Sequence, residues 1–291
     1  MQAARHFCFF VAAGLVFGGM APVAVAAEPA RHVFGAQSAP SAGPAVPYGS
    51  YAKGCLAGAV ALPETGLGWQ AMRLGRNRNW GHPAMIRFIE RLSDEAAAIG
   101  WPRLYVGDIS QPRGGPMNGG HRSHQIGLDA DIWLRIPGPA VLSIGEREEI
   151  SSHSVVRPDR MAVNDAWRPA HHALIRQAAS DPAVARIFVN AAIKQALCAD
   201  EPPGESPGAR GWLRKVRAWW GHESHFHVRL NCPEDAPGCV GQALPPVGDG
   251  CGEELAWWFT EEALHPKPPA IPRAELTLDD LPQACRATVL R

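Results

Sequence analysis

The sequence lacks a net charge of either sign, and charged residues are scarce for its length. Its 28 basic and 28 acidic side chains cancel, and charged residues make up 19% of the 291 positions. A protein that wraps nucleic acid normally has a basic excess, so the composition indicates no such partner. Because 46% of the residues are hydrophobic, the chain can bury a sizeable core and is not a disordered polymer.

Several sequence signatures of known chemistry are also missing. Neither a Walker A loop nor a GxGxxG fingerprint occurs, which removes the common nucleotide-binding motifs. The zinc signature HExxH fails as well, since Phe226 occupies the second histidine position after His222-Glu223. No CxxC pair exists, and a zinc-cysteine cluster is therefore disfavoured.

The N-terminus predicts a secretory signal peptide at residues 1–26. Arg5 and His6 precede a short apolar run, and Ala24-Val25-Ala26 forms a small-x-small cleavage site. An N-terminal membrane anchor is the alternative, but the run is too short and too rich in glycine and alanine to span comfortably. We therefore expect export with cleavage near Ala26, and no later segment reads as a membrane span.

The cysteines support an exported protein. Of the seven, Cys8 leaves with the signal peptide, and an even number in an exported chain is typical of a disulfide set. Spacing alone does not choose among the possible pairings of the remaining six: Cys55, Cys198, Cys232, Cys239, Cys251 and Cys285.

The rest of the chain predicts one α+β domain. Residues 27–50 are rich in Ala, Pro, Gly and Ser and are expected to form a flexible leader. Residues 51–291 form the domain, with a proline-rich C-terminal tail lying over the surface. Apolar periodicity predicts helices from about His82 to Gly100, over 170–179 and over 191–198, and strands at 104–108, 128–134, 187–189 and 225–230. Helices and short strands mix without a βαβ rhythm, which favours α+β.

A tryptophan-rich stretch admits two interpretations. Trp212, Val216, Trp219 and Trp220 recur at helical spacing, which favours a helix packed into the core. A platform for carbohydrate is the alternative.

Two histidine-rich segments carry the chemistry, at residues 121–131 and 222–227. Residues two apart on a strand point to one face, so His225 and His227 project together. Asp129 and Asp131 share a face by the same rule. His124 lies an odd number of positions before Asp131, and Gly127 between them offers the bend that lets them converge.

This set of side chains suits zinc. Imidazole nitrogen and carboxylate oxygen are common zinc ligands, and catalytic sites use three protein ligands plus an open position. His124, Asp131 and one histidine of the His225/His227 pair would supply such a site.

Three longer motifs resemble the penicillin-insensitive murein endopeptidases, a similarity that extends over nearly the whole chain from Cys55 to Cys285. They are Ser110-Gln111-Pro112-Arg113-Gly114-Gly115-Pro116, His121-x-x-His124-Gln125-x-Gly127-Leu128-Asp129-x-Asp131-Ile132-Trp133 and His222-x-x-His225-x-His227-Val228-Arg229-Leu230. The resemblance implies the α+β zinc-peptidase fold shared with lysostaphin-like enzymes, D-Ala-D-Ala dipeptidases and hedgehog domains. A small antiparallel sheet carries the zinc, flanked by helices and long disulfide-stapled loops.

The resemblance also implies a function and site residues. It implies a periplasmic zinc peptidase that hydrolyses the D-alanyl–meso-diaminopimelyl cross-links of peptidoglycan. The zinc triad falls on His124, Asp131 and His227, with His121 as a further metal-site histidine. The accompanying catalytic histidines are His222 and His225. The implied disulfides are Cys55–Cys285, Cys198–Cys251 and Cys232–Cys239.

Alternatives remain at this stage. The resemblance also implies that some family members hold a second metal between the two motifs, but the stretch 157–161 lacks the clear Asp/His pair for it. Glu223 competes with His225 as a base by strand parity, and Arg113 and Arg229 are substrate-carboxylate ligands or structural ion-pair partners. The rival functions are a D,D-carboxypeptidase of the same fold and a non-catalytic peptidoglycan-binding or metal-storage protein.

Overall fold

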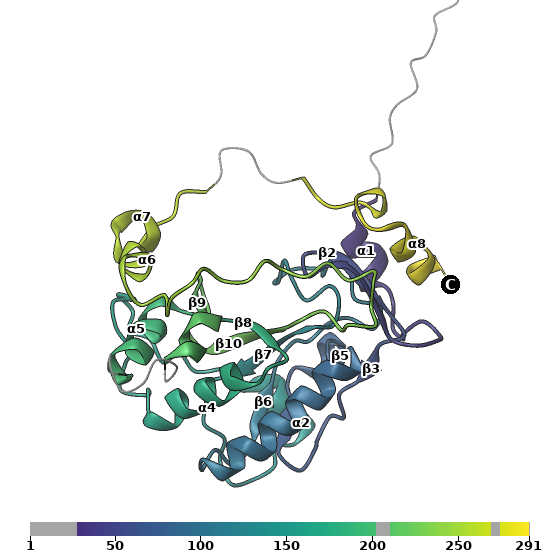
Figure 1. Ribbon diagram of the computed structural model, residues 1–291. Helices are drawn as coiled ribbons and strands as arrows, with labels where there is room; N and C mark the ends of the chain where they lie inside the picture. Colours follow the sequence, from purple (N-terminus) through teal and green to yellow (C-terminus); the bar gives the residue numbers. More distant parts are fainter. Residues whose placement is uncertain (1–27, 202–209, 269–273, 291) are drawn as a thin grey trace, which may run out of the picture.

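A computed structural model describes residues 28–201, 210–268 and 274–290, so the expected signal peptide lies outside it. The described residues form a mixed α+β fold around one six-stranded sheet, with strand order β4-β6-β7-β10-β8-β9 (Figure 1). Its strands are β4 (Trp69–Ala71), β6 (Leu104–Val106), β7 (Asp129–Trp133), β10 (His225–Leu230), β8 (Val184–Val189) and β9 (Val216–Ala218). The α+β class predicted from the sequence is confirmed.

The sheet is larger than the small antiparallel sheet expected from the sequence. Its four central strands, from β6 to β8, pair antiparallel. The edge strands β4 and β9 each pair parallel to their neighbour, which makes the sheet mixed. Two small antiparallel pairs accompany it: β1 (Val46–Ser50) with β2 (Lys53–Ala57), and β3 (Val60–Ala61) with β5 (Trp80–Gly81).

Eight helices and four short 3-10 helices surround the sheets within the described ranges. The helices are α1 (Ala30–Gly35), α2 (Pro83–Ala98), α3 (Ile144–Glu149), α4 (Pro169–Ser180), α5 (Ala191–Asp200), α6 (Glu253–Ala256), α7 (Glu261–Leu264) and α8 (Gln283–Leu290). The 3-10 helices are η1 (Leu74–Arg76), η2 (Gly211–Lys215), η3 (Trp257–Phe259) and η4 (Leu278–Asp280). No helix in these ranges is both long and apolar enough to cross a bilayer.

Local sequence explains the longest helix, α2. Pro83 occupies its first turn, where a missing N–H costs nothing, and His82 caps it by accepting a hydrogen bond from the Ala84 amide at Nδ1. Its apolar residues lie on one stripe and are buried, as the sequence periodicity predicted.

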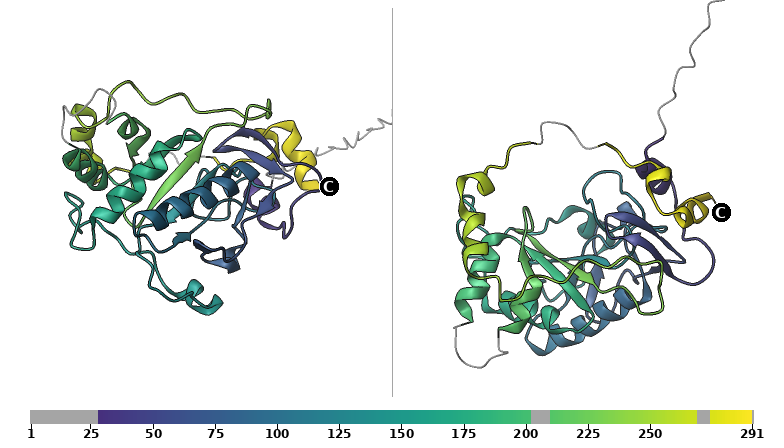
Figure 2. Two further views of the ribbon diagram at one scale, coloured as in Figure 1. Left: turned by 60° about the horizontal axis from the view of Figure 1, so that its bottom comes forward. Right: turned by 45° about the horizontal axis from the view of Figure 1, so that its top comes forward.

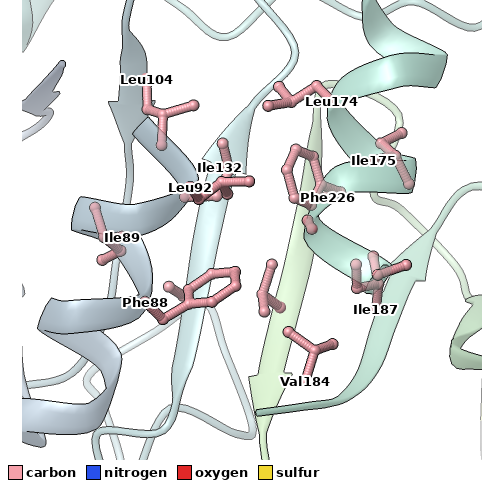
Figure 3. Packing of buried hydrophobic residues seen from close by; sticks show 14 of the residues in the cluster. Phe88, Ile89, Leu92, Leu104, Ile132, Leu174, Ile175, Val184, Ile187 and Phe226 are labelled. Carbon is pink, nitrogen blue, oxygen red and sulfur yellow. The ribbon is translucent and has the colours of Figure 1, made fainter. Parts of the chain in front are cut away.

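Helices α2 and α4 cover one face of the sheet (Figure 3). Phe88 and Leu92 of α2 and Leu174 of α4 pack against Phe226 of β10 and Ile132 of β7, and all five are at most 1% exposed. Because side chains alternate along a strand, the residues between these core positions on β7 and β10 point to the opposite face. That face carries the histidines and aspartates.

The expected flexible leader is folded instead. Residues 28–50 include α1 and β1, and Phe34 is fully buried in a small second core with Cys55, Cys285 and Val289. Helices α1 and α8 lie side by side at one end of the molecule in both orientations of Figure 2. The leader lacked a long periodic run because α1 is short and takes its partners from the distant C-terminus.

The tryptophan-rich stretch is not a helix packed in the core. A 3-10 helix, η2, ends at Lys215, and the chain then extends as β9 beside β8. Trp212 is buried, but Trp219 and Trp220 are 49% and 38% exposed. Strand pairing with β8 therefore overrides the helical spacing.

Three disulfides fasten the loops and the C-terminal segment: Cys55–Cys285, Cys198–Cys251 and Cys232–Cys239. These are the pairs implied by the resemblance. The Cys55 bridge joins β2 to α8, so the end of the chain is a docked helix as well as a surface tail.

Candidate metal centre

Strand register gathers the polar residues of β7 and β10. His227 lies directly opposite Asp131, and Arg229 lies opposite Asp129. Directly opposed residues share a face of the sheet, so these four side chains meet on the face away from α2 and α4. The strand parity predicted from the sequence is therefore the arrangement observed.

A bent loop brings His124 to the same place. His124 and Gly127 both have positive φ, 66° and 67°, and a Cβ at Gly127 would collide with Leu56 and the His82 amide. The His124 amide donates to Asp129 Oδ2 at 2.9 Å, which fixes the strained turn. The bend expected at Gly127 is thus present.

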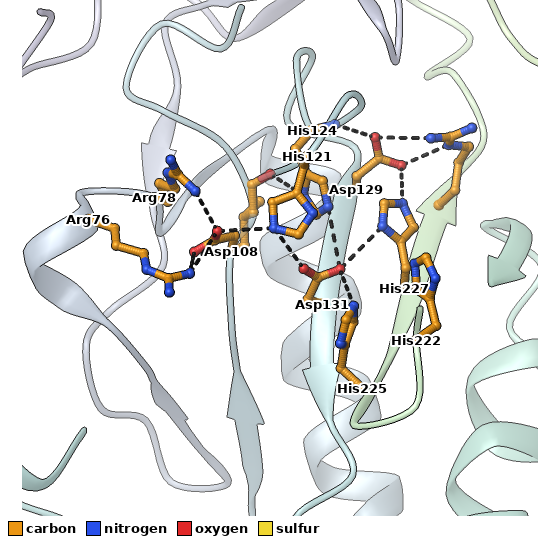
Figure 4. A network of polar contacts seen from close by, with 12 residues as sticks. Arg76, Arg78, Asp108, His121, His124, Asp129, Asp131, His222, His225 and His227 are labelled. Atoms are coloured by element: carbon orange, nitrogen blue, oxygen red, sulfur yellow. Dashed lines mark hydrogen bonds and ion pairs between the residues drawn. The ribbon is translucent and has the colours of Figure 1, made fainter. Parts of the chain in front are cut away.

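One carboxylate, Asp131, lies at the centre of the histidines (Figure 4). Its Oδ1 lies 3.4 Å from His124 Nε2, 3.2 Å from His227 Nδ1 and 3.7 Å from His225 Nε2. His121 Nε2 lies 3.4 Å from Oδ2 of the same carboxylate. His121, His124 and Asp131 offer ligand atoms that all lie within 4.8 Å of one another and could hold a metal ion.

Two buried polar atoms of this cluster fit a metal. Among the described residues, neither His124 Nε2 nor Asp131 Oδ1 has a hydrogen-bond partner. An unsatisfied buried polar atom costs free energy, and a cation between these two atoms would remove that cost. Ligands at about 2.0–2.1 Å in a tetrahedron lie about 3.3–3.4 Å apart, close to the separations at Asp131 Oδ1. The residues therefore suit a tetrahedral ion such as zinc.

Outer hydrogen bonds orient the histidine rings. His124 Nδ1 lies 2.8 Å from the Ile109 carbonyl, so this nitrogen carries the proton and Nε2 faces the cluster with a lone pair. His227 Nε2 lies 2.9 Å from Asp129 Oδ1, which leaves Nδ1 toward Asp131. Carboxylate and carbonyl partners of this kind are typical of metal-binding histidines.

Asp129 is a functional residue that the sequence reasoning placed but gave no role. It is fully buried and accepts hydrogen bonds from Arg229 Nε at 2.8 Å, from His227 and from the His124 amide. Burial alone would raise the pKa of Asp129, but Arg229 and His227 outweigh it and hold the pKa well below its usual range. The sequence signal that could have indicated this role is the Asp-x-Asp spacing on β7, which pairs with His-x-Arg on β10.

Asp108 was missed altogether. Its carboxylate accepts hydrogen bonds from Arg78 at 2.8 Å and lies 3.2 Å from His121 Nε2, so it orients His121 (Figure 4). Burial would raise its pKa, but the bonds from His121 and Arg78 lower it to about 2. It lies just beyond β6, in a segment where the sequence showed no motif.

The rings of His222 and His225 lie beside each other in the cluster, with centroids 4.9 Å apart. Burial lowers the pKa of both rings, that of His222 to about 3, with the neighbouring histidines acting in the same direction. For Asp131 the balance is opposite: burial would raise its pKa, but His124 and His225 lower it well below the usual value. For His227, burial would lower the pKa, but Asp129 and Asp131 outweigh it and raise the pKa of this ring.

A family model described as penicillin-insensitive murein endopeptidase matches residues 47–290. The chain belongs to this family. A member from Haemophilus influenzae is 50% identical over 221 residues, which cover 75% of this chain and 74% of the relative. Members from Klebsiella pneumoniae and Escherichia coli are each 43% identical over 86% and 85% of this chain, and 88% and 87% of their own length. The resemblance stated from the motifs is therefore confirmed.

Other residues considered in the sequence analysis make contacts that do not involve a metal ligand directly, or lie away from the cavities. Arg113 donates to the Thr288 carbonyl at 2.8 Å and holds the C-terminal helix rather than a ligand. Arg229 is an ion-pair partner of Asp129, and Glu223 lines neither of the two cavities beside the cluster. In the stretch 157–161, Asp159 pairs with Arg157.

Two cavities of this murein endopeptidase relative open onto the cluster from different sides. One, of about 230 Å³, is lined by Asp131 and His225 together with Arg73 and Arg76. The other, of about 480 Å³, is lined by His222 and His227 together with Arg122, Arg186, Phe188, Trp219 and Trp220. His121 lines both, so the cluster stands between two hollows.

Proposed function

We propose that this protein is a periplasmic zinc peptidase that hydrolyses the D-alanyl–meso-diaminopimelyl cross-links of peptidoglycan. Its family and the names of its relatives support a murein endopeptidase. The single observation that carries the endopeptidase assignment is the cluster between two cavities. A cross-linked substrate has a peptide stem on each side of the bond that is cleaved, and each stem needs room.

His124, Asp131 and His227 are the proposed zinc ligands, with His121 as a further metal-site residue. Their support is the short separations at Asp131 Oδ1, the orphaned His124 Nε2 and the outer partners that aim each imidazole. When bound there, zinc supplies Lewis acidity, which polarises the scissile carbonyl and makes water more acidic. Asp129 and the Ile109 carbonyl keep the two imidazoles in the tautomers that the ion requires.

His225 and His222 are the proposed catalytic residues. His225 points into the smaller cavity beside Asp131 and remains 22% exposed at its side chain, so a reacting group can reach its Nε2. It would accept the proton of the attacking water and return it to the leaving amine. His222, whose Nδ1 lies 2.8 Å from the Trp220 carbonyl, faces the larger cavity and would hydrogen-bond the substrate or pass protons to His225.

The D,D-carboxypeptidase of the same fold remains the second candidate, because the same ligands would serve it. A carboxypeptidase removes one terminal residue and needs a long hollow on one side only. Cavities on both sides of the cluster favour the endopeptidase. A binding or storage protein would need no reachable histidine such as His225 beside the ligands.

The test separates these functions by substrate and by metal content. Purified mature protein is incubated with cross-linked muropeptide dimers and, separately, with linear pentapeptides, and the products are identified by mass spectrometry. We expect dimers to be split and pentapeptides to persist, with one zinc per chain by elemental analysis. Preferential loss of the terminal D-alanine would support the carboxypeptidase instead, and intact substrates with a zinc-loaded protein would contradict both enzymes.

Variants of the ligands complete the test. His124→Ala, Asp131→Ala and His227→Ala should each lose zinc and activity together. His153→Ala is the matched control, because His153 is exposed, accepts a hydrogen bond from Arg135 and lines neither cavity. A ligand variant that retains stoichiometric zinc would remove that residue from the proposed set.

A further inference from the structure

The larger cavity beside the metal centre contains more cationic side chains than its surroundings neutralise. Arg122, Arg186 and Arg229 line it, and no aspartate or glutamate in the described part of the chain does. Arg229 is already paired with Asp129 at 2.8 Å. The cavity therefore has a positive wall, and the question is which of its arginines is available to a ligand.

Arg186 stands out because strand pairing places it among like charges. On β8 it lies directly opposite Arg229 of β10, and β9 brings Arg217 opposite Phe188, two residues further along the same face. Like charges directly opposite each other across strands destabilise a sheet. Arg217 is neutralised by Glu254, whereas no carboxylate among the described residues lies within ion-pair distance of Arg186.

The surroundings of Arg186 add to that cost. Burial, then Arg217 and Arg229, lower the pKa of its guanidinium, and the group that opposes them is the Tyr51 phenol rather than a carboxylate. Its one side-chain hydrogen bond to a described residue goes from Nη2 to the Ala243 carbonyl at 2.8 Å, which leaves its other N–H donors available to a ligand. A half-buried cation without a counterion is the expected state of a site whose anion comes from the substrate.

The position of Arg186 fixes where that anion lies along the substrate. Its guanidinium carbon lies 5.9 Å from the centre of the Phe188 ring, which in turn lies 5.4 Å from the His227 ring. An extended peptide advances roughly 3.3–3.6 Å per residue. A carboxylate about two or three residues from the cleaved bond therefore reaches the guanidinium.

We propose that Arg186 binds a carboxylate of the peptide stem in the larger cavity and so determines the preference for acidic, non-amidated stems. This inference rests on the proposed function, because the stems are those of peptidoglycan. A guanidinium presents two parallel N–H donors that match a carboxylate. The stem offers two such groups at the right distance, on the D-glutamyl residue and on the diaminopimelyl residue.

Three proteins and three substrates test the proposal. Wild type, Arg186→Gln and Arg217→Gln are compared on muropeptide dimers with free carboxylates, with the D-glutamyl carboxyl amidated and with the diaminopimelyl carboxyl amidated. Glutamine removes the charge and the paired donors but keeps a polar, hydrogen-bonding side chain of similar width. Arg217 is the matched control, since it lies on the same face of the sheet but does not line the larger cavity.

We expect Arg186→Gln to raise KM on the acidic dimer about 10- to 100-fold with little change in kcat, because the bond is made equally in the ground and transition states. Amidation of the carboxyl that Arg186 contacts should raise the KM of the wild type by a similar factor and should not raise the KM of Arg186→Gln further. Arg186→Lys, which keeps the charge but not the paired donors, should recover part of the loss. The substrate whose amidation raises KM for the wild type but not for Arg186→Gln identifies which carboxylate Arg186 binds.

Other results would overturn the inference. If Arg186→Gln loses the same factor on acidic and amidated dimers, the arginine is structural. If the coupling appears in Arg122→Gln and not in Arg186→Gln, the exposed Arg122 is the ligand instead. Wild-type protein that splits dimers without any preference for free carboxylates refutes this inference alone, whereas failure to split any dimer refutes the proposed function as well.

Discussion

Substitution of Asp129 by asparagine should weaken metal binding without touching a metal ligand. Asp129 Oδ1 receives the His227 and Arg229 Nε hydrogen bonds, and Oδ2 receives the His124 amide. An asparagine amide replaces one oxygen by an NH₂ group, which cannot accept, so at least one donor faces another donor. Loss of such an outer partner costs about 10- to 100-fold in metal affinity, which is about 1.4–2.7 kcal/mol.

The same substitution should destabilise the protein through Arg229. The side chain of Arg229 is 9% exposed, and its guanidinium would lose its buried counterion, a change that costs about 3–5 kcal/mol. The double variant Asp129→Asn/Arg229→Met also removes the guanidinium. It should recover much of the stability, because no uncompensated buried charge remains. The zinc affinity of the double variant should stay low, because His227 still lacks its acceptor.

Two measurements separate these effects. Zinc affinity is obtained by competition with a chromophoric chelator, and the free energy of unfolding is obtained from urea titrations of the metal-free proteins. The reasoning is refuted if Asp129→Asn binds zinc as tightly as the wild type. It is also refuted if the double variant recovers full affinity, since the effect would then come from the charge of Arg229 and not from the orientation of His227.

Three further outcomes follow from the structure. His225→Ala should retain zinc and lose about 10²–10⁴-fold in turnover, measured on dimers, and near-normal turnover of the loaded variant would exclude His225 from the chemistry. Burial, then Arg217, lowers the pKa of Lys194 to about 7, so the folded protein releases a proton that the unfolded chain holds up to about pH 10.4. Stability relative to Lys194→Met should therefore rise between these pH values, by at most about 1.4 kcal/mol per unit, and parallel pH profiles in urea unfolding would contradict this. Removal of the Cys55–Cys285 bridge in Cys55→Ser/Cys285→Ser should lower the free energy of unfolding by about 5 kcal/mol, because the bridge joins residues 230 positions apart. Cys232→Ser/Cys239→Ser should lower it by about 2–3 kcal/mol, because its cysteines are 7 positions apart. Equal losses for the two variants in urea unfolding would exclude the chain-entropy explanation.

The parts of the fold that follow from local periodicity could be predicted from the sequence. Helix α2 has a proline start and a clear apolar stripe, and strand β10 has strict alternation, so both were located nearly to the residue. The polar face of β7 and β10 followed from parity alone. Side chains alternate along any single strand, so the residues that share a face can be assigned without knowing the partner strand.

The parts that depend on distant partners could not be predicted in this way. Helix α1 packs on α8 across almost the whole chain, and neither segment has enough apolar residues to indicate a helix alone. The exposed Trp219 and Trp220 were assigned to the core because a short 3-10 turn followed by an edge strand mimics helical spacing. Asp108 carries no motif, and its role depends on the fold bringing Arg78 and His121 to it.

The sheet makes the metal centre depend on the core. Phe226 and Val228 of β10 are fully buried against the helices, while His225 and His227, between and beside them, face the cluster. A shift of one residue in the pairing with β7 would place the histidines in the apolar core and the phenylalanine in the cavities. The free energy of burying the apolar face therefore fixes the register His227 to Asp131, and with it the distances on which metal binding depends. Two of the proposed ligands, Asp131 and His227, thus lie on paired strands, whereas His121 and His124 reach the cluster from the loop that bends at Gly127.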